Sequence, residues 1–252
     1  MKQNTQGLRF GKKPPIRDYR TFLLQNYIKD DIPNPPDSLD SLDRVYENIN
    51  PAVPTTLFPM FANDEIGDCT IAAMAHGDTV WSALVGNKSI YPEELVKKIY
   101  FHLTGGDDTG LAMLTVLDYF RKNFVMDERI YAYMSLNAHN HTHVKQAIML
   151  FGGLFLGFQV QEKCLEEFKN GTPWQPGVLM NAGHAVFVTG YNKEGLNMLT
   201  WGNTQRGTWD WWDWCVDEAY VILPPEAINP DFTPGFDFKR LKEDLISVAE
   251  WV

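Results

Sequence analysis

Residues 67–75 read Gly-Asp-Cys-Thr-Ile-Ala-Ala-Met-Ala, and they carry the strongest structural signal in this 252-residue chain. The small and apolar run from Ile71 predicts a helix, extending to about Leu84, that is buried on nearly all sides. A cysteine at its start lies where unpaired backbone N–H groups and the helix dipole stabilise a thiolate. The same N–H groups can stabilise an oxyanion. Cys69 is therefore a candidate nucleophile, and the alternative is a small core residue at a helix start.

A second pattern lies downstream, where residues 183–191 read Gly-His-Ala-Val-Phe-Val-Thr-Gly-Tyr. The apolar run predicts a strand over residues 185–191, with His184 at its mouth rather than inside it. A lone histidine in such a place is more often structural. Together with a cysteine at a helix start, His184 is the base that the thiol needs.

These patterns occur in an order that resembles the papain-like cysteine peptidases. The chain has Gly-x-Cys at a helix start, then Gly-His-Ala-Val with Gly-Tyr, a Trp-Gly turn and an Ala-Tyr-Val-Ile-Leu strand. The resemblance covers roughly Phe58 to Leu223. It implies an α+β, papain-like fold, with an N-terminal helical subdomain, a C-terminal antiparallel β subdomain and the site in the cleft between them. It also implies that Cys69 is the nucleophile and His184 the general base.

The family's remaining site residues have substitutes in this sequence. Six positions before Cys69, where the family has the glutamine that completes the oxyanion hole, stands Asn63. The family's Asn-Ser-Trp-Gly is replaced by Leu-Thr-Trp-Gly-Asn at residues 199–203. An ungapped count puts Thr200 where the asparagine that orients the histidine belongs, and Asn203 takes that role only if the turn is rearranged. The carboxylate of Asp68, the residue before Cys69, could shift the protonation equilibrium of the Cys–His pair in either direction.

The regions outside the resemblance have unlike compositions. Residues 1–56 are predicted to form a basic extended arm, a short helical segment over residues 19–28 and an irregular proline-rich strap, residues 57–225 the papain-like domain, and residues 226–252 a proline-rich tail with a terminal amphipathic helix. The first twenty residues hold six basic residues against one acidic residue. This arm could dock on an acidic partner or on its own domain, but a solvated, flexible terminus is the favoured interpretation.

Periodicity and turn residues predict the other elements of the domain. Helices are expected at Tyr91–Thr104, Leu111–Asn123 and His143–Phe151, the last capped by Thr142, and strands at Leu154–Val160, Leu196–Trp201 and Ala219–Leu223.

Composition limits the class of protein and its partners. The net charge of -10 argues against a nucleic-acid partner. Neither a secretory leader nor an apolar run of membrane-spanning length is apparent, so a cytoplasmic protein without a membrane partner is expected. Three cysteines in unlike contexts suit a reducing compartment, and Cys164 and Cys215 are predicted to be structural.

Two stretches, one rich in histidine and one rich in tryptophan, are candidate ligand sites. Three alternating histidines, at positions 139, 141 and 143, invite zinc but lack a cysteine or acidic partner at ligand spacing, so neither a metal nor a cofactor is predicted. Four tryptophans in residues 209–214 suit a packed corner that shields the histidine better than a carbohydrate or peptide platform.

Two functions remain open from the sequence. The first is a cysteine hydrolase that cleaves an amide bond in protein or peptidoglycan, using a Cys–His mechanism. The second is a weakly active or inactive papain-like scaffold, docked to an assembly through its terminal arms. The overall layout also resembles uncharacterised papain-like proteins of tailed phages and prophages, through Asn-Asp-x-x-Gly-Asp-Cys-Thr at residues 63–70, Thr-Trp-Gly at 200–202 and Asp-Glu-Ala-Tyr at 217–220. This resemblance implies that such a scaffold would be a virion-associated structural or binding protein.

Overall fold

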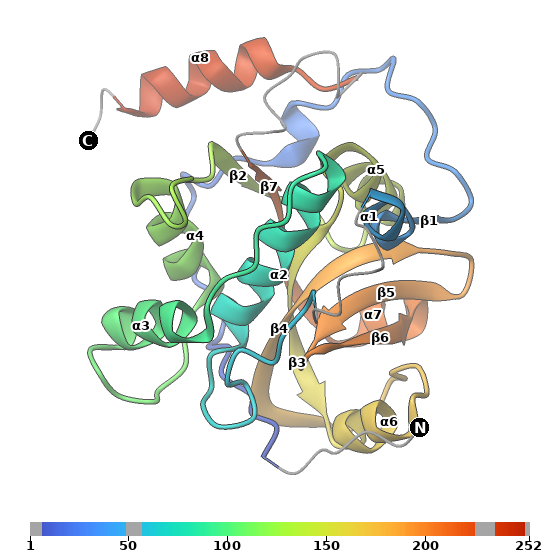
Figure 1. The fold of residues 1–252 in the computed structure, drawn as a ribbon. Coiled ribbons are helices and arrows are strands. Elements are labelled where there is room, and N and C mark those ends of the chain that lie inside the picture. The colour runs from blue at the N-terminus through green and yellow to red at the C-terminus, as the bar shows by residue number, and fades with distance from the viewer. Residues whose placement is uncertain (1–6, 49–56, 225–234, 250–252) are drawn as a thin grey trace.

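The computed structural model describes residues 7–48, 57–224 and 235–249. Its centre is an antiparallel sheet in which strands are neighbours in the order β2-β7-β3-β4-β5-β6 (Figure 1). The short strand β1 pairs with the last two residues of β4, Gly190 and Tyr191. The strands are β1 (Leu39–Asp40), β2 (Ala132–Ser135), β3 (Leu154–Gln161), β4 (Leu179–Tyr191), β5 (Gly195–Thr200), β6 (Asn203–Thr208) and β7 (Val216–Leu223).

Helices cover both faces of this sheet, and the longest, α2, crosses the front of the view in Figure 1. The helices are η1 (Leu24–Asn26, a 3-10 turn), α1 (Ser41–Asn48), α2 (Cys69–Leu84), α3 (Glu93–Thr104), α4 (Met113–Lys122), α5 (His141–Phe151), α6 (Cys164–Asn170), α7 (Trp209–Cys215) and α8 (Phe238–Ala249). None of the helices in the described residues is long and apolar enough to cross a membrane.

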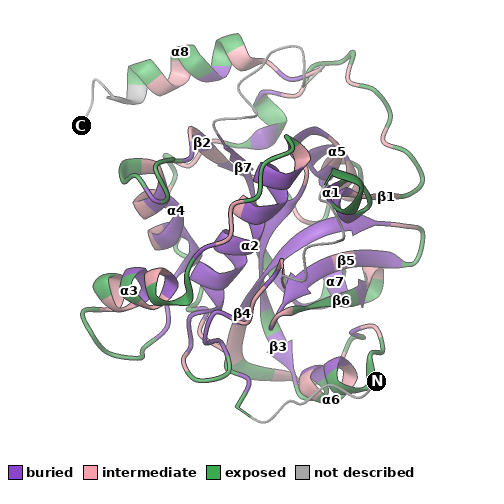
Figure 2. Cartoon of the chain, viewed as in Figure 1, coloured by how far each residue is buried: buried purple, intermediate pink, exposed green. Residues whose placement is uncertain are grey.

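Two hydrophobic clusters lie on opposite faces of the sheet, as the period of two along a strand requires. On β4, Phe187 packs with α2, α3 and α4, whereas Val186 and Val188 pack with α5 to α8. Helix α2 lies so close to the sheet that a Cβ built on Gly77 would come within 2.7 Å of the Phe187 ring. Figure 2 shows α2 buried along most of its length, which confirms the helix predicted from its apolar run.

The structure corrects several expectations about local structure. The strap contains α1, which the prolines around it had seemed to exclude. Helix α5 begins two residues early, because the side chain of Asn140, not Thr142, accepts a hydrogen bond from the His143 N–H. Only the short turn η1 forms within the helical segment expected over residues 19–28.

The C-terminal half also differs in extent. Strand β4 begins at Leu179, so His184 lies inside a strand and not at its mouth. The tryptophan-rich stretch forms helix α7, capped by Thr208. The terminal amphipathic helix is confirmed as α8, with Leu241 fully buried, whereas the proline-rich stretch before it, residues 225–234, lies outside the described residues.

Candidate active site

Cys69 is the first residue of α2, and the turn before it is held from two sides. The Asp108 side chain accepts hydrogen bonds from the Gly67 N–H, at 2.9 Å, and from the Tyr100 hydroxyl. This brings the loop that ends at Gly110 against the start of the helix. The first N–H groups of α2 have no partner within the helix and point toward this end. The sulfur of Cys69 therefore lies where a helix favours negative charge, but only 1% of the residue is exposed.

His184 lies fully buried in the middle of β4 with its ring held by three neighbours. Nε2 lies 2.7 Å from the hydroxyl of Thr200 at the end of β5. The indole of Trp201 stacks on the imidazole, with ring centroids 4.3 Å apart, and Phe158 meets it edge-on. Nδ1 is also buried, and none of the described residues forms a hydrogen bond with it. One ring nitrogen is thus held in place, and the other is left for chemistry.

The cysteine and the histidine are brought to the same place by the packing of α2 on β4. The backbones of Ala185, the residue after His184, and of Gly11 act to lower the pKa of the Cys69 thiol. Burial nevertheless raises the pKa of the Cys69 thiol to about 12 and lowers the pKa of His184 to about 3. In this closed arrangement the site therefore holds a neutral thiol and a neutral imidazole, not an ion pair.

The other residues proposed from the sequence lie at different distances from this centre. Thr200 contacts His184, whereas Asn203 is exposed on β6 and accepts a hydrogen bond from the Thr204 N–H. The Asn63 amide donates to the Ile66 carbonyl at 3.2 Å. Of the two candidates for orienting the imidazole, the structure places Thr200 against the ring and Asn203 away from it.

Asp68 is fully buried directly before Cys69. Burial raises the pKa of this carboxyl to about 8, while its own backbone and the Asn63 amide act in the opposite direction. Neither carboxyl oxygen has a hydrogen-bond partner among the described residues. The carboxyl is therefore largely protonated at neutral pH. When it ionises, its negative charge raises the pKa of the adjacent thiol further.

The N-terminal arm lies over the site, contrary to the favoured expectation of a solvated terminus. Its residues 9–13, here called the arm segment, run behind α2 in Figure 1. Within the arm segment Gly11 accepts a hydrogen bond from the Leu111 N–H at 2.8 Å, and Lys12 donates one to the Gly183 carbonyl at 3.1 Å. A Cβ built on Gly11 would lie 1.7 Å from the Gly67 carbonyl oxygen, so only glycine fits there. The arm segment is one wall of the space around Cys69.

Sequence reasoning missed two further contacts to the site. Phe10 meets the His184 ring edge-on, with centroids 5.6 Å apart, and the Arg9 carbonyl accepts a hydrogen bond from the Trp201 indole. The shielding of the histidine therefore comes from Trp201, Phe158 and the arm segment, and not from the four tryptophans of residues 209–214. The basic run near the N-terminus was the only signal in the sequence that could have drawn attention to the arm segment.

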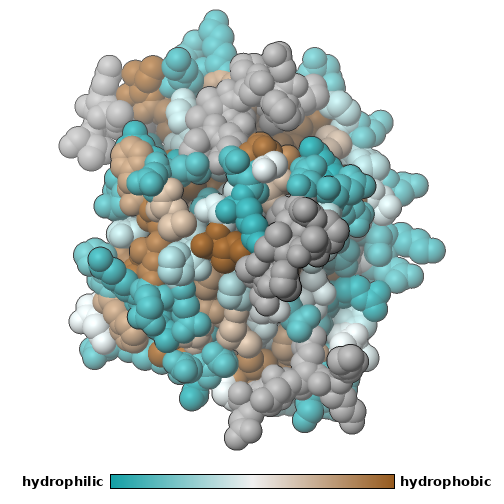
Figure 3. All heavy atoms as spheres, in the orientation of Figure 1, coloured by the Kyte–Doolittle hydropathy of each residue, from teal (hydrophilic) through white to brown (hydrophobic). Residues whose placement is uncertain are grey.

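The remaining candidate groups lie elsewhere. His141 bonds the Asp213 carboxylate at 2.7 Å and packs on Trp209. No cluster of three or more His, Cys, Asp or Glu side chains within residues 7–48, 57–224 and 235–249 is arranged to hold a metal ion. Cys164 and Cys215 are buried and free. Figure 3 shows a face of the molecule in which apolar patches are scattered among polar side chains.

Comparisons with known proteins relate this arrangement to solved structures. No protein-family model matches the chain, and no curated protein matches it by sequence. Among solved structures, xylellain, a cysteine protease from Xylella fastidiosa, is 15% identical and superposes with a TM-score of 0.64, covering 88% of this chain and 98% of its own.

Two precursor enzymes superpose nearly as well. Digestive procathepsin L 3 of Tenebrio molitor larval midgut is 12% identical, with a TM-score of 0.62 and coverage of 87% of this chain and 77% of its own. Procathepsin B S9 from Trypanosoma congolense is 14% identical, with a TM-score of 0.58 and coverage of 86% and 87%. The predicted α+β, papain-like fold is thereby confirmed.

Proposed function

We propose that this protein is a cysteine hydrolase that cleaves an amide bond and that is latent while the arm segment covers Cys69. The observation that carries the proposal is the state of the His184 ring. Its Nε2 contacts the Thr200 hydroxyl at 2.7 Å, and its Nδ1 is buried without a hydrogen bond to any described residue, beside a cysteine at a helix start. His76 also has a buried Nδ1 without a hydrogen bond to any described residue, so what distinguishes His184 is its place next to Ala185, which packs in the same core cluster as Cys69.

The proposed mechanism uses Nδ1 of His184, the ring nitrogen that has no hydrogen bond to a described residue. With Nε2–H donating to Thr200, Nδ1 carries the lone pair and accepts the Cys69 proton as the sulfur attacks the carbonyl carbon. The oxyanion would be held by the backbone N–H of Cys69 and by the Asn63 amide once it leaves Ile66. The amine leaves with the proton from His184. A water that His184 deprotonates then cleaves the thioester and regenerates the thiol.

The arm segment accounts for the absence of an ion pair in the closed state. Burial is the largest cause of both pKa shifts, so exposure of the site would lower the pKa of Cys69 and raise that of His184. Gly11 lies against Gly67, two residues before Cys69, and its carbonyl oxygen is held by the Leu111 N–H at 2.8 Å. The arm segment would thus block the nucleophile without being cleaved by it.

Substrate cleavage by an opened chain tests the proposal. Gly11→Ala in the full chain should expel the arm segment, and fluorescein-labelled casein and purified peptidoglycan are the two substrates to compare. Release of amines from either one, abolished by Cys69→Ser and by His184→Ala, is the expected result. An opened chain that cleaves neither substrate at any pH from 5 to 9, while Cys69 is freely alkylated, would contradict the proposal.

A second function is favoured by one observation, the burial of Cys69 beneath an arm that is itself anchored by ion pairs. A permanently closed site suits a papain-like scaffold, including a virion-associated one, which binds its partners elsewhere. In that case Gly11→Ala would destabilise the fold without producing a reactive thiol. The same casein and peptidoglycan assays, read beside thermal unfolding, separate the two functions.

A further inference from the structure

The side chain of Lys12 is buried in an acidic pocket next to the candidate active site. Its Nζ lies 2.9 Å from Asp217 Oδ2 and 3.0 Å from Glu218 Oε1, and only 1% of the side chain is exposed. Burying a lysine is costly unless its charge is paired and hydrogen-bonded. Two carboxylates for one ammonium therefore make this pocket selective for a cation.

The pocket has the shape of a channel for an unbranched stem. A Cβ built on Gly157 of β3 would lie 2.1 Å from Lys12 Cε and 2.5 Å from the Met113 sulfur. Because Gly157 has no side chain, strand β3 leaves room for the methylene groups of Lys12. The glycine provides the space, and the methionine provides an apolar wall for the methylene groups.

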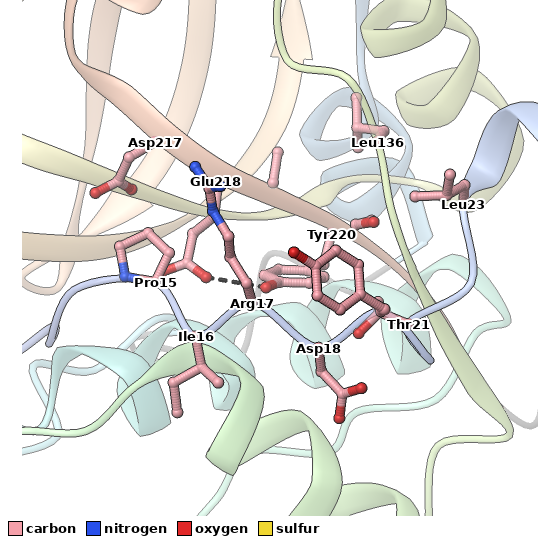
Figure 4. Close-up of a pocket in the computed structure, with 13 residues that line it drawn as sticks. Pro15, Ile16, Arg17, Asp18, Thr21, Leu23, Leu136, Asp217, Glu218 and Tyr220 are labelled. Carbon is pink, nitrogen blue, oxygen red and sulfur yellow. Dashed lines mark hydrogen bonds between the residues drawn. The ribbon is translucent and has the colours of Figure 1, made fainter.

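The acidic pair can also be reached from outside the arm segment. Figure 4 shows a cavity of about 600 Å³ whose lining includes Pro15, Arg17, Asp217, Glu218 and Tyr220. The Tyr220 hydroxyl donates to Glu218 Oε2 at 3.0 Å, which fixes the carboxylate. Asp217 keeps 31% of its side chain exposed. Glu218 is thus held in place with or without an occupant, whereas Asp217 is paired with Lys12 itself.

The backbone around Lys12 is bound as an extended peptide would be. Lys12 forms β-bridges with Leu111 on one side and with Gly183, the neighbour of His184, on the other. The preceding residue, Gly11, lies against Gly67 in the turn before Cys69. The acidic pocket therefore receives the side chain of the residue next to the one at the start of the cysteine helix.

We infer that Asp217, Glu218 and Gly157 form a specificity pocket for a lysine or arginine side chain of a peptide substrate, and that Lys12 is its resident occupant. This inference rests on the proposed function, because it assigns the substrate class of the same site. The arm segment and a basic peptide compete for one place. Positive charge in the substrate then decides which peptides displace the arm segment.

Labelling with peptide electrophiles tests the inference. In the full-length Lys12→Ala chain, Cys69 is labelled with peptidyl acyloxymethyl ketones that carry lysine, norleucine or glutamate at the first, second or third residue before the electrophile. At one of these three positions, the probe with lysine should react at least tenfold faster than the probe with norleucine, because a buried charge-assisted pair adds that much affinity. Asp217→Asn with Glu218→Gln should reduce the ratio to threefold or less, and Asp210→Asn, an exposed acidic control, should preserve it.

A second measurement applies even if the arm segment stays in place when the Lys12 side chain is removed. Lys12→Ala leaves a vacancy that n-butylammonium fits and n-butanol does not satisfy. Butylammonium at 20 mM or so should raise the melting temperature of Lys12→Ala, but not that of the parent or of the exposed control Lys13→Ala. Adding Glu218→Gln to Lys12→Ala should remove the rise.

The outcomes separate this inference from the proposed function. Equal labelling by lysine and norleucine probes, or no ammonium effect on Lys12→Ala, overturns the specificity pocket and leaves the hydrolase intact. Labelling by simple iodoacetamide that does not depend on His184 overturns the hydrolase. Lysine-selective labelling together with ammonium rescue supports the pocket.

Discussion

The Nε2 atom of His184 and the hydroxyl of Thr200 lie 2.7 Å apart, joining two residues that are 16 positions apart in the chain. A hydroxyl both donates and accepts, so this contact permits either tautomer of the imidazole. An asparagine carbonyl in the same place would only accept, which fixes the proton on Nε2. The substitution of threonine for the expected asparagine thus affects how well Nδ1 is kept available as a base.

Thr200→Val removes the partner of Nε2 while keeping the shape of the side chain. We expect the cleavage rate of the Gly11→Ala chain to fall by roughly ten- to a hundredfold, the usual contribution of a positioned acid–base group. Stability should fall by about 1–3 kcal/mol, because a buried nitrogen is left without a partner. Steady-state kinetics and urea unfolding measure the two effects. Thr200→Ser, which restores the hydroxyl, should recover most of the rate, and an unchanged rate in Thr200→Val would contradict the role.

Gly11→Ala tests whether the arm segment controls access to the thiol. The added Cβ would overlap the Gly67 carbonyl, and the arm segment has no room to shift within its hydrogen bonds to Leu111 and Gly183. Alkylation of Cys69 by iodoacetamide at pH 8 should accelerate at least tenfold, measured by peptide mass spectrometry. Gly177→Ala, where a Cβ makes only ordinary contacts, is the matched control. Equal rates in the parent and in Gly11→Ala would show that the arm segment is not the barrier.

Much of the fold could be predicted because its signals are local. The run of small and apolar residues after Cys69 leaves no polar face, so a buried helix was the only suitable element. Strand β4 is buried on both faces from His184 onward, so its apolar residues do not alternate with polar ones, and Asn181 and Gly183 interrupt the apolar residues at its start. His184 was therefore expected at the end of the strand, although pairing with β3 extends the strand past it.

The environment of the site could not be predicted, because its partners are distant in the chain. Lys12 meets Asp217 across 205 positions, and nothing in either stretch specifies the other. Pairing Nε2 with Thr200 and not Asn203 depends on the register between β5 and β6, where Thr200 lies opposite Asn203 at the turn. Likewise, helix α7 is formed by aromatic residues with weak helix propensity, and its burial against the sheet overrides that preference.

Asp68 should make the stability of the protein fall as the pH rises. Its pKa is raised from 3.8 to about 8. At a pH between these two values, the folded chain therefore keeps a proton on Asp68 that the unfolded chain has lost. The parent should lose up to roughly 4 kcal/mol of unfolding free energy between pH 5 and pH 8 from this group, at 1.36 kcal/mol for each pH unit.

Asp68→Asn keeps the size of the side chain and cannot ionise, so most of that loss should disappear. Urea unfolding of both chains at pH 5 and pH 8 makes the comparison. If the two chains lose the same stability between these pH values, Asp68 is not protonated in the folded state.

His76 should contribute to acid unfolding in the opposite range. Burial lowers its pKa from 6.5 to about 4, and Nε2 lies 2.8 Å from the Pro59 carbonyl. Below pH 6.5 the unfolded chain binds a proton at His76 that the folded chain does not bind. The free energy of unfolding therefore declines as the pH falls toward 4, by about 3 kcal/mol at most.

His76→Gln keeps an N–H donor and does not titrate, so its stability should decline less steeply from pH 6.5 to pH 4 than that of the parent. Equilibrium unfolding across this range measures the difference, with His139→Gln as an exposed histidine control. Parallel stability curves for parent and His76→Gln would exclude His76 as a source of acid sensitivity.

The pH dependence of Cys69 alkylation in the Gly11→Ala chain, measured with and without His184→Ala, tests the central claim most directly. If Cys69 and His184 form a catalytic pair once the arm segment is displaced, iodoacetamide should modify Cys69 rapidly at pH 6, and His184→Ala should shift the reactive pKa up toward about 8.5, the value of a free cysteine. If the opened chain reacts only above pH 8 and is indifferent to His184→Ala, the pair does not exist and the protein is not a cysteine hydrolase.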